Sequence, residues 1–313
     1  IPAERVGRSG YGGGWAEGYN YDRRASRAAV QYYAALRSAL EQDFTHNSSY
    51  WRDKIYWLIY GTTPDAGHFV PWDDNDTVYL HRFDREELLM LAGDLTSGHA
   101  QYWLNHVNSA QIAYSGCVEL IFRDKVLAET NFSGLPGARL FEGIGLGIMR
   151  SGWGTSDTLT TFKASDWFST YQDNAAGSFM IYKTAPLTVK SGVFDGMLHD
   201  HYSNYVIRTI AYNGLTVGDP GEQFFAPSGT STANDGGQMV QQWSTDPISV
   251  EDWRLQANRT GTAPNGLAYP VRDTVDWVQV DSTSDYGYAA ASFNKAYVAG
   301  KVGFASRQVL QVK

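Results

Sequence analysis

Residues 171–179 read Tyr-Gln-Asp-Asn-Ala-Ala-Gly-Ser-Phe and form the most informative stretch of this 313-residue chain. The run before them, 157–165, is rich in threonine, and the run after them, 178–183, is rich in aromatic and aliphatic residues. β-Branched and aromatic residues favour strands. The stretch therefore connects two predicted strands, and it places a tyrosine, a glutamine and an aspartate at the connection.

The chain upstream has the periodicity of helices. Apolar residues recur on one helical face in several segments, and capping residues stand where helices are expected to begin. The predicted helices cover 23–43 and 49–60, and two more begin at Asp84, through a capping-box pairing with Glu87, and at Ser97. The glycines between residues 10 and 18 predict a loop that brings backbone close to another element. Four such helices fit either a small bundle or the last turns of a helical toroid.

After about residue 112 the pattern changes to short β-branched and aromatic runs separated by turn residues. The predicted strands are 117–122, 144–150, 157–164, 177–183, 186–193, 205–211, 213–217, 275–281, 286–291, 296–302 and 305–312. So many strands without intervening helices predict antiparallel sheets in a large sandwich. The predicted fold class is therefore α+β multidomain, with helices in 1–112 and a β-sandwich in 113–313.

Composition narrows the function classes. Hydrophobic residues make up 43% of the chain and charged ones 19%, which is enough apolar material for a sizeable core. A net charge of −8 argues against nucleic acid as a partner, and it suits a polyanion only where arginines or lysines gather locally. The 20 tyrosines and 10 tryptophans suit either sugar binding or a β-rich core. No apolar run is long enough for a membrane span. The single cysteine, Cys117, excludes an internal disulfide and is predicted to lie in the core.

Residues 171–179, and six segments that occur in order along the chain, resemble the heparinase II/III-like polysaccharide lyases. Residues 171–179 are similar to that family's His-x-His-x-Asp-x-Gly-Ser-Phe segment, with Tyr171 and Asp173 where the family has histidines. The loop Gly13-Gly-Trp-Ala-Glu-Gly-Tyr-Asn-Tyr21 resembles the family's Gly-Gly-aromatic-x-Glu-Gly-x-x-Tyr loop. The other similar segments are 146–153, 177–182 with 189–194, 205–213, 235–238 and 307–310.

The resemblance implies the C-terminal helices of an α/α toroid, in 1–112, followed by an antiparallel β-sandwich, in 113–313. It implies β-elimination at a uronic acid of a polysaccharide, although some relatives epimerise the same carbon. The implied partner is an acidic polysaccharide or oligosaccharide, and the implied location is secreted or periplasmic. Ile1 is not a natural start, so we also expect a preceding toroid segment, or a partner chain, to cover the apolar stripes of the helices.

Elimination requires removal of the C5 proton, neutralisation of the carboxylate and protonation of the departing O4. Tyr21 matches the tyrosine of the family's glycine loop and is the leading acid/base candidate, with Tyr19 second. A tyrosine that acts as a base needs a cation or several donors nearby, because its ordinary pKa is about 10. Glu17 is expected to orient the loop or to bind a sugar hydroxyl. Packing of both tyrosines against the helix that follows is the alternative.

The sandwich contributes the other candidates. Tyr171 stands where the family's substrate-facing histidine stands, and is expected to donate a proton. Gln172 is a candidate for binding the sugar, and Arg150 either pairs with a substrate carboxylate or binds a carbonyl inside the sandwich. The resemblance extends more loosely to three further substrate-binding candidates, which are His201, Tyr202 and Asn213.

The family's zinc positions correspond here to Asp173, Lys190 and Tyr212. Lysine carries a positive charge and repels a metal, so we expect no cofactor, with zinc as the disfavoured alternative. The interpretation is that an ion pair between Asp173 and Lys190 takes the place of zinc and holds the same strands together.

Two other functions are consistent with the sequence. Loss of the histidines favours a carbohydrate-binding or structural protein without catalysis. A glycoside hydrolase on an α/α toroid is the other alternative, and it needs two carboxylates across a cleft. Glu17 with one of Asp73, Asp74 or Asp76 would supply them.

Overall fold

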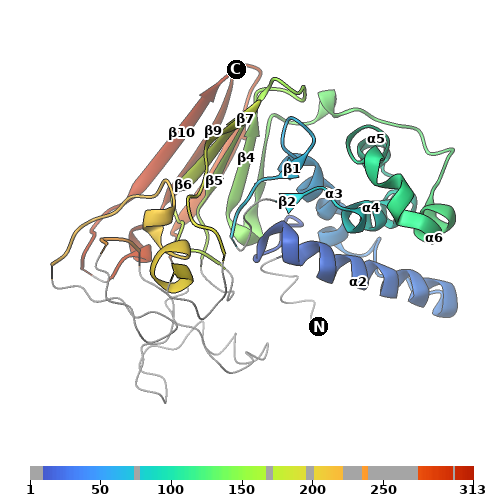
Figure 1. Cartoon of the computed structure of the whole chain (residues 1–313), viewed down its shortest axis with the longest axis horizontal. Helices are drawn as coiled ribbons and strands as arrows, with labels where there is room; N and C mark the ends of the chain where they lie inside the picture. The colour runs from blue at the N-terminus through green and yellow to red at the C-terminus, as the bar shows by residue number, and fades with distance from the viewer. Residues whose placement is uncertain are drawn as a thin grey trace, which may run out of the picture.

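The computed structural model describes residues 10–73, 78–166, 172–194, 201–220, 235–238, 274–298 and 300–313. Helices occupy one side of the molecule and two antiparallel sheets the other (Figure 1). This is the α+β fold class that the sequence predicted. None of the helices in the described part of the chain has the length and apolar character that crossing a membrane requires.

The helices come first in the chain. They are α2 (Gly18–Leu40), α3 (Ser49–Gly61), α4 (Arg82–Asp94), α5 (Gly98–Tyr102) and α6 (Ile112–Phe122), with a π-helical turn at Trp103–Val107. The predicted cap at Ser97 is confirmed, because its hydroxyl accepts from the Ala100 amide. The predicted start at Asp84 is wrong by three residues. His81 caps α4, and the Asp84 carboxylate lies in the first turn and accepts from the His81 amide.

The segment that includes Cys117 differs most from its prediction. Residues 117–122 were expected to form a strand and instead belong to helix α6. Cys117 was expected in the core but is exposed. The large side chains Tyr114, Leu120 and Ile121 are also exposed on this helix. The apolar composition that suggested a buried strand therefore lies on an uncovered helical surface.

Two sheets make up the rest of the described structure, together with a short pairing of β1 (His68–Phe69) with β2 (Val78–Tyr79). The five-stranded sheet has the order β3-β4-β5-β6-β7, and its strands are Ala138–Phe141, Leu146–Arg150, Thr158–Lys163, Ser178–Lys183 and Ala185–Thr188. The three-stranded sheet has the order β10-β9-β8, with β8 at Trp277–Ser282, β9 at Tyr286–Ser292 and β10 at Ser306–Val312.

Several predicted strands are not strands in the structure. Residues 205–211 fall in a π-helical turn, Tyr202–Val206, and a 3-10 turn, Thr209–Ala211. Residues 213–217 and 296–302 form no strand among their described positions, whereas strand β3 was not predicted. Aromatic and β-branched residues in these segments fill the core from irregular backbone, because burial rather than strand pairing is what selects them.

The larger sheet is the middle of three layers. On β4, Leu146 and Ile148 pack into the core shared with the helices, while Met149 packs with the three-stranded sheet. Successive side chains of a strand point to opposite faces, so a strand buried on both faces reads as continuously apolar. Every residue of β4 is buried, as this arrangement requires.

Helix α6 ends at Phe122, ten residues beyond the predicted domain boundary at residue 112. The core of the helices continues onto the sheet, because Trp57 and Leu58 of α3 belong to the same buried cluster as Leu146. The division into domains 1–112 and 113–313 stays a prediction.

Candidate functional site at the junction of helices and sheet

A buried ionic cluster joins the helical part to the sheet at Asp73. The Asp73 carboxylate accepts from the Lys163 ammonium of β5, with 2.9 Å between Oδ2 and Nζ. The Lys190 ammonium donates to the Asp73 backbone carbonyl at 2.6 Å. The side chains of Asp73 and Lys163 are at most 2% exposed. Lys163 of β5 and Lys190, two residues beyond the end of β7, therefore converge on one aspartate of the loop that follows β1.

Asp173 and Tyr212 complete the cluster. The Tyr212 hydroxyl donates to the Asp173 carboxylate, and its ring stacks on Trp72 with centroids 5.8 Å apart. The Asp173 amide lies 3.4 Å from the second carboxylate oxygen of Asp73. Burial, and then the Asp173 charge, raise the pKa of Tyr212 well above its usual value. The phenol therefore remains a proton donor to the carboxylate at any physiological pH.

The three positions that the family resemblance assigns to zinc thus surround Asp73. These residues do not fit a metal, because an ammonium and a protonated phenol offer donors where a cation needs electron pairs. Within the described ranges, no group of three His, Cys, Asp or Glu residues is arranged to hold a metal ion. The predicted ion pair between Asp173 and Lys190 stays a prediction, since the bonds described here join Lys190 to Asp73 and Asp173 to Tyr212.

Sequence reasoning missed Asp73 and Lys163 as members of this cluster. Lys163 and Thr161 alternate on β5, and the Thr161 hydroxyl accepts from the Trp72 indole at 2.8 Å. A lysine at a buried strand position was the available signal, because lysine is almost never buried without a partner. Asp73 also has a φ of +60°, a strained value for a residue with a side chain. The ionic contacts hold the loop in that conformation.

The glycine loop packs against α3, as its composition predicted. Gly13 has a φ of +86°, and a Cβ there would lie 2.3 Å from the Asp53 carbonyl carbon. Tyr19, the second acid/base candidate, is 1% exposed and stacks between Trp57 and Phe69, with centroids at 4.0 and 4.4 Å. Its hydroxyl donates to the Trp57 carbonyl at 3.0 Å. Burial, and then the Asp22 charge, raise the pKa of Tyr19 well above its usual value, so its placement is that of a core residue.

Tyr21, the leading candidate, lies in the first turn of α2 and is partly exposed. Its neighbour Asp22 fixes that turn, because the Asp22 carboxylate accepts from the Trp57 indole at 2.8 Å and pairs with the buried Lys54 ammonium. Glu17 is the residue before the helix, and its carboxylate accepts from the Trp15 indole at 3.2 Å. Tyr21 therefore lies in a helical turn that Asp22 ties to α3, and Glu17, just before the helix, accepts from Trp15.

Of the two roles that the sequence left open for Arg150, the structure shows binding to backbone carbonyls. Its guanidinium donates to the backbone carbonyls of Tyr60, at 2.9 Å, and Thr62, and its side chain is buried. Burial lowers the pKa of Arg150 to about 10. These carbonyls lie at the end of α3, where helical hydrogen bonds run out. Arg150 therefore ties α3 to β4 and does not present its charge to solvent.

Replacing Arg150 with methionine is expected to lower the free energy of unfolding by about 3 kcal/mol, because buried carbonyls lose a charged donor. Urea denaturation followed by tryptophan fluorescence would measure it. A variant with unchanged stability but weakened polysaccharide binding would contradict this structural role.

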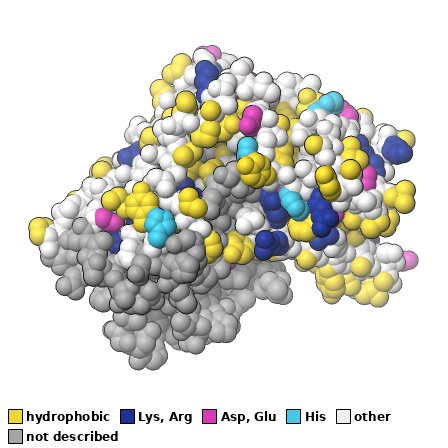
Figure 2. Space-filling model, in the orientation of Figure 1, with side chains coloured by type: hydrophobic (Ala, Val, Ile, Leu, Met, Phe, Trp, Pro, Cys, Tyr) yellow, Lys and Arg dark blue, Asp and Glu magenta, His cyan; other side chains and the backbone are white. Residues whose placement is uncertain are grey.

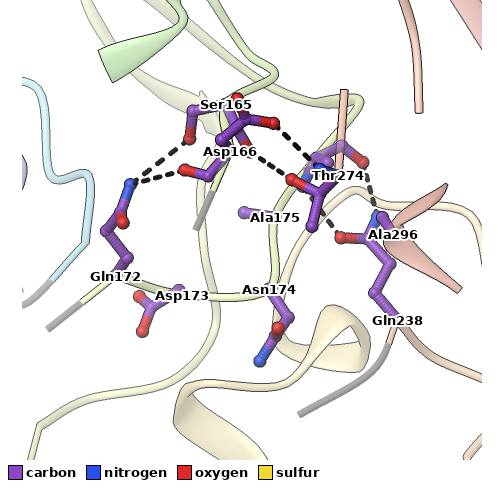
Figure 3. Close-up of a pocket in the computed structure, with 10 residues that line it drawn as sticks. Ser165, Asp166, Gln172, Asp173, Asn174, Ala175, Gln238, Thr274 and Ala296 are labelled. Atoms are coloured by element: carbon purple, nitrogen blue, oxygen red, sulfur yellow. Dashed lines mark hydrogen bonds between the residues drawn. The ribbon is translucent and has the colours of Figure 1, made fainter. Parts of the chain in front are cut away.

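Gln172 lines a small polar pocket beside Asp173 (Figure 3). Its amide nitrogen lies 3.4 Å from the Ser165 hydroxyl and 3.3 Å from the Asp166 carbonyl. Thr274 and Gln238 bond on the other side of the pocket, to the carbonyls of Ser165 and Ala176. The pocket volume is about 10 Å³, which suits one water molecule and not a sugar ring. The Gln172 side chain therefore hydrogen-bonds to other residues of the protein, and its expected contact with the substrate stays a prediction.

The looser candidates are dispersed. Tyr202 is 1% exposed and packs edge-on against Phe194 at 5.1 Å between centroids. Asn213 donates from its side chain to the Phe179 carbonyl at 2.9 Å, which holds the start of β6. His201 is exposed and stacks on Tyr205 at 5.5 Å. Of the three, His201 is exposed, Asn213 is partly exposed and Tyr202 is buried.

Some predicted residues lie outside the described residues. Tyr171 is one of them, so its approach to Tyr21 stays a prediction. Asp74 and Asp76, named for the hydrolase alternative, also lie outside the described residues. Asp73 itself is buried and paired with Lys163, which leaves it poorly placed as a hydrolytic carboxylate facing a substrate.

The comparisons with known proteins add the fold relationship. No protein-family model matches the sequence, and no curated protein matches it. Among solved structures, heparinase III with methylated lysines aligns with 95% of this chain and 36% of its own chain, at 12% identity and a TM-score of 0.54. Heparan sulfate lyase HepC from Pedobacter heparinus aligns with 93% of this chain and 36% of its own, at 13% identity and a TM-score of 0.48.

The likeness to the methylated heparinase III is one of fold, since identity is 12%. That fold combines helices with antiparallel sheets, as the described part of this chain does. This chain spans about a third of the length of the structures that it matches, with 36% of each covered.

Proposed function

We propose that this chain is the C-terminal part of a polysaccharide lyase that cleaves uronic-acid-containing polysaccharides by β-elimination, without a bound metal. One observation carries the proposal: Asp173, Lys190 and Tyr212, which replace the family's zinc ligands, form one buried cluster around Asp73. The cluster anchors the segment that carries Tyr171 two residues before Asp173. The residues that replace the zinc ligands are still bonded to one another through Asp73. This supports a retained role for the segment in binding or catalysis.

In the proposed reaction a tyrosine phenolate removes the proton at C5 of the uronate, and the C5 electron pair forms the C4–C5 double bond. The C4–O4 bond breaks, and O4 takes a proton from an acid, which restores a hydroxyl at the end of the leaving chain. Tyr21 is the base or acid, and Tyr171 the second proton carrier. A cation beside the substrate carboxylate would stabilise the charge that develops there.

The full activity is proposed for a longer assembly. The alignment with heparinase III covers 95% of this chain but only 36% of the heparinase III chain. We propose that further toroid helices, preceding this segment or supplied by a partner chain, complete the substrate groove. We also propose a secreted or periplasmic location, where polysaccharide substrates occur.

The reaction is tested by incubating the protein, together with its preceding segment where one exists, with glucuronate-, iduronate- and mannuronate-containing polysaccharides. A C4–C5 unsaturated uronate absorbs in the ultraviolet, so a rise in absorbance coupled to chain shortening is the expected result. Chain shortening without that absorbance would indicate hydrolysis and overturn the proposal.

A carbohydrate-binding protein without catalysis is the second candidate. The replacement of family histidines by Tyr171 and Asp173 favours it, because tyrosine is a poor base at neutral pH unaided. Retained binding of an acidic polysaccharide with no turnover across the panel would establish this alternative.

The exposed apolar face of α6 predicts association. Leu120 is 85% exposed and Ile121 69%, and uncovered patches of large apolar side chains mark interaction surfaces. Replacing both with glutamine is expected to reduce self-association of this chain, as measured by sedimentation velocity. The control is Leu187→Gln and Val312→Gln, two exposed apolar residues of the sheets. An unmodified chain that is monomeric at high concentration would contradict the prediction.

A further inference from the structure

Two arginines, one on α2 and one on α4, are exposed and make no ion pair within the described part of the chain. Arg24 lies on α2 and Arg82 is the first residue of α4. Their neighbours are different, because Arg23 pairs with Asp84 at 3.4 Å and Arg27 pairs with Glu86. Asp84 and Glu86 of α4 are thus engaged by Arg23 and Arg27, and the exposed side chains of Arg24 and Arg82 face solvent.

His81 lies among these arginines as a neutral donor. Its Nδ1 accepts from the Phe83 amide at 3.2 Å, so the ring proton of the neutral form is on Nε2. Burial, followed by the charges of Arg23, Arg82, Arg24 and Arg27, lowers the pKa of His81. The backbone contact therefore fixes the ring and leaves Nε2–H as the group that can donate to a ligand.

This basic patch, defined as Arg24, Arg82 and His81, adjoins the leading catalytic candidate. Tyr21 and Arg24 are three residues apart on α2, a spacing that places side chains side by side on a helix. Arg23 donates to the Tyr79 carbonyl at 3.0 Å and so holds β2 against α2. Figure 2 shows Lys and Arg side chains gathered beside a histidine on the surface over the start of α2 and near β2.

The charge of the patch contrasts with that of the whole chain, which is −8. Overall negative charge repels polyanions, so a local group of exposed guanidiniums determines where an anionic chain can approach. Guanidinium groups bind carboxylate and sulfate oxygens through paired hydrogen bonds, and an imidazole N–H adds a third donor.

We propose that Arg24, Arg82 and His81 form a subsite for a carboxylate or sulfate group of an anionic sugar chain, next to the ring that Tyr21 acts on. The assignment rests on the proposed function for its position relative to the scissile bond. The subsite would make the protein selective for polysaccharides that carry an anionic group close to the reacting uronate.

The test is binding of a heparan sulfate hexasaccharide and of its desulfated form, measured by titration calorimetry on the full protein at two salt concentrations. R24Q/R82Q is expected to weaken binding at least about tenfold, since a charge-assisted hydrogen bond contributes about 1.5 kcal/mol or more. The loss is expected to shrink at high salt, because salt screens exposed charges. The variant H81N keeps a side-chain oxygen to cap α4, and is expected to weaken binding by a smaller factor.

The matched control is R52Q/K125Q, which removes the same charge from exposed positions on α3 and after α6. Binding that falls equally in both double variants would show a general charge effect and overturn the subsite. A loss confined to the sulfated probe assigns sulfate, and a loss with both probes assigns carboxylate. Arginine-dependent binding without elimination would refute the lyase and keep the subsite, whereas elimination unaffected by R24Q/R82Q in rate and affinity would refute the subsite alone.

Discussion

Tyr21→Phe is expected to reduce the turnover of uronate elimination by about 10² to 10⁴-fold, the range over which a positioned proton-transfer group contributes. The substitution removes only the phenolic hydroxyl from a partly exposed position in the first turn of α2. The ring and the helix remain, so substrate affinity is expected to change little. Initial rates of absorbance increase over a range of substrate concentrations would separate the two quantities.

Tyr19→Phe is the matched control, two residues away on the same helix. Its hydroxyl donates to the Trp57 carbonyl inside the core, so its loss is expected to cost about 1 kcal/mol of unfolding free energy and little turnover. If Tyr19→Phe abolished elimination and Tyr21→Phe did not, the assignment of Tyr21 would be wrong.

Lys163→Met is expected to lower the free energy of unfolding by about 3–5 kcal/mol, because it leaves the Asp73 carboxylate buried without its ammonium partner. Asp73→Asn is expected to have a similar effect for the converse reason, and asparagine tolerates the positive φ of this position. The measurement is chemical denaturation of each variant at neutral pH.

The double variant Asp73→Asn with Lys163→Met tests the pairing itself. Its cost is expected to be well below the sum of the single costs, since no charge is left unpaired. Asp53→Asn, which breaks the half-exposed pair with Arg139, is the surface control and is expected to cost less than about 1 kcal/mol. Stoichiometric zinc in the purified protein, lost in Asp173→Asn, would contradict the metal-free cluster.

Several regular elements were predictable from the sequence. Helix α3 and strands β5 and β6 lie close to their predicted ranges, because their apolar spacing matches the burial that each receives. Helix α6 was not predictable. Residues 117–122 are mostly apolar, which usually indicates a buried strand or helix, yet several of these side chains face solvent. The period of a short apolar run does not separate strand from helix.

The candidate site divides in the same way. The sequence indicated that Asp173, Lys190 and Tyr212 belong together. It did not indicate that Lys190 and Asp173 bond to Asp73, or that Tyr212 bonds to Asp173. It left open two roles for Arg150, and only the structure shows the guanidinium on the carbonyls at the end of α3. Bonds between residues some 90 positions apart depend on how the layers pack, which no local pattern encodes.

Local sequence alone was enough to establish that helices precede antiparallel sheets, that a glycine loop ends at Tyr21, and that histidine is absent from two positions of residues 171–179. These follow from local conformational preference and from residue identity. The folded structure was needed to show that Lys163 and Lys190 converge on Asp73, that Tyr19 is buried, and that Arg24 and Arg82 are exposed. The reason is physical: the partner of a charged or aromatic side chain is chosen by the packing of distant segments, and burial then fixes the strength of that contact.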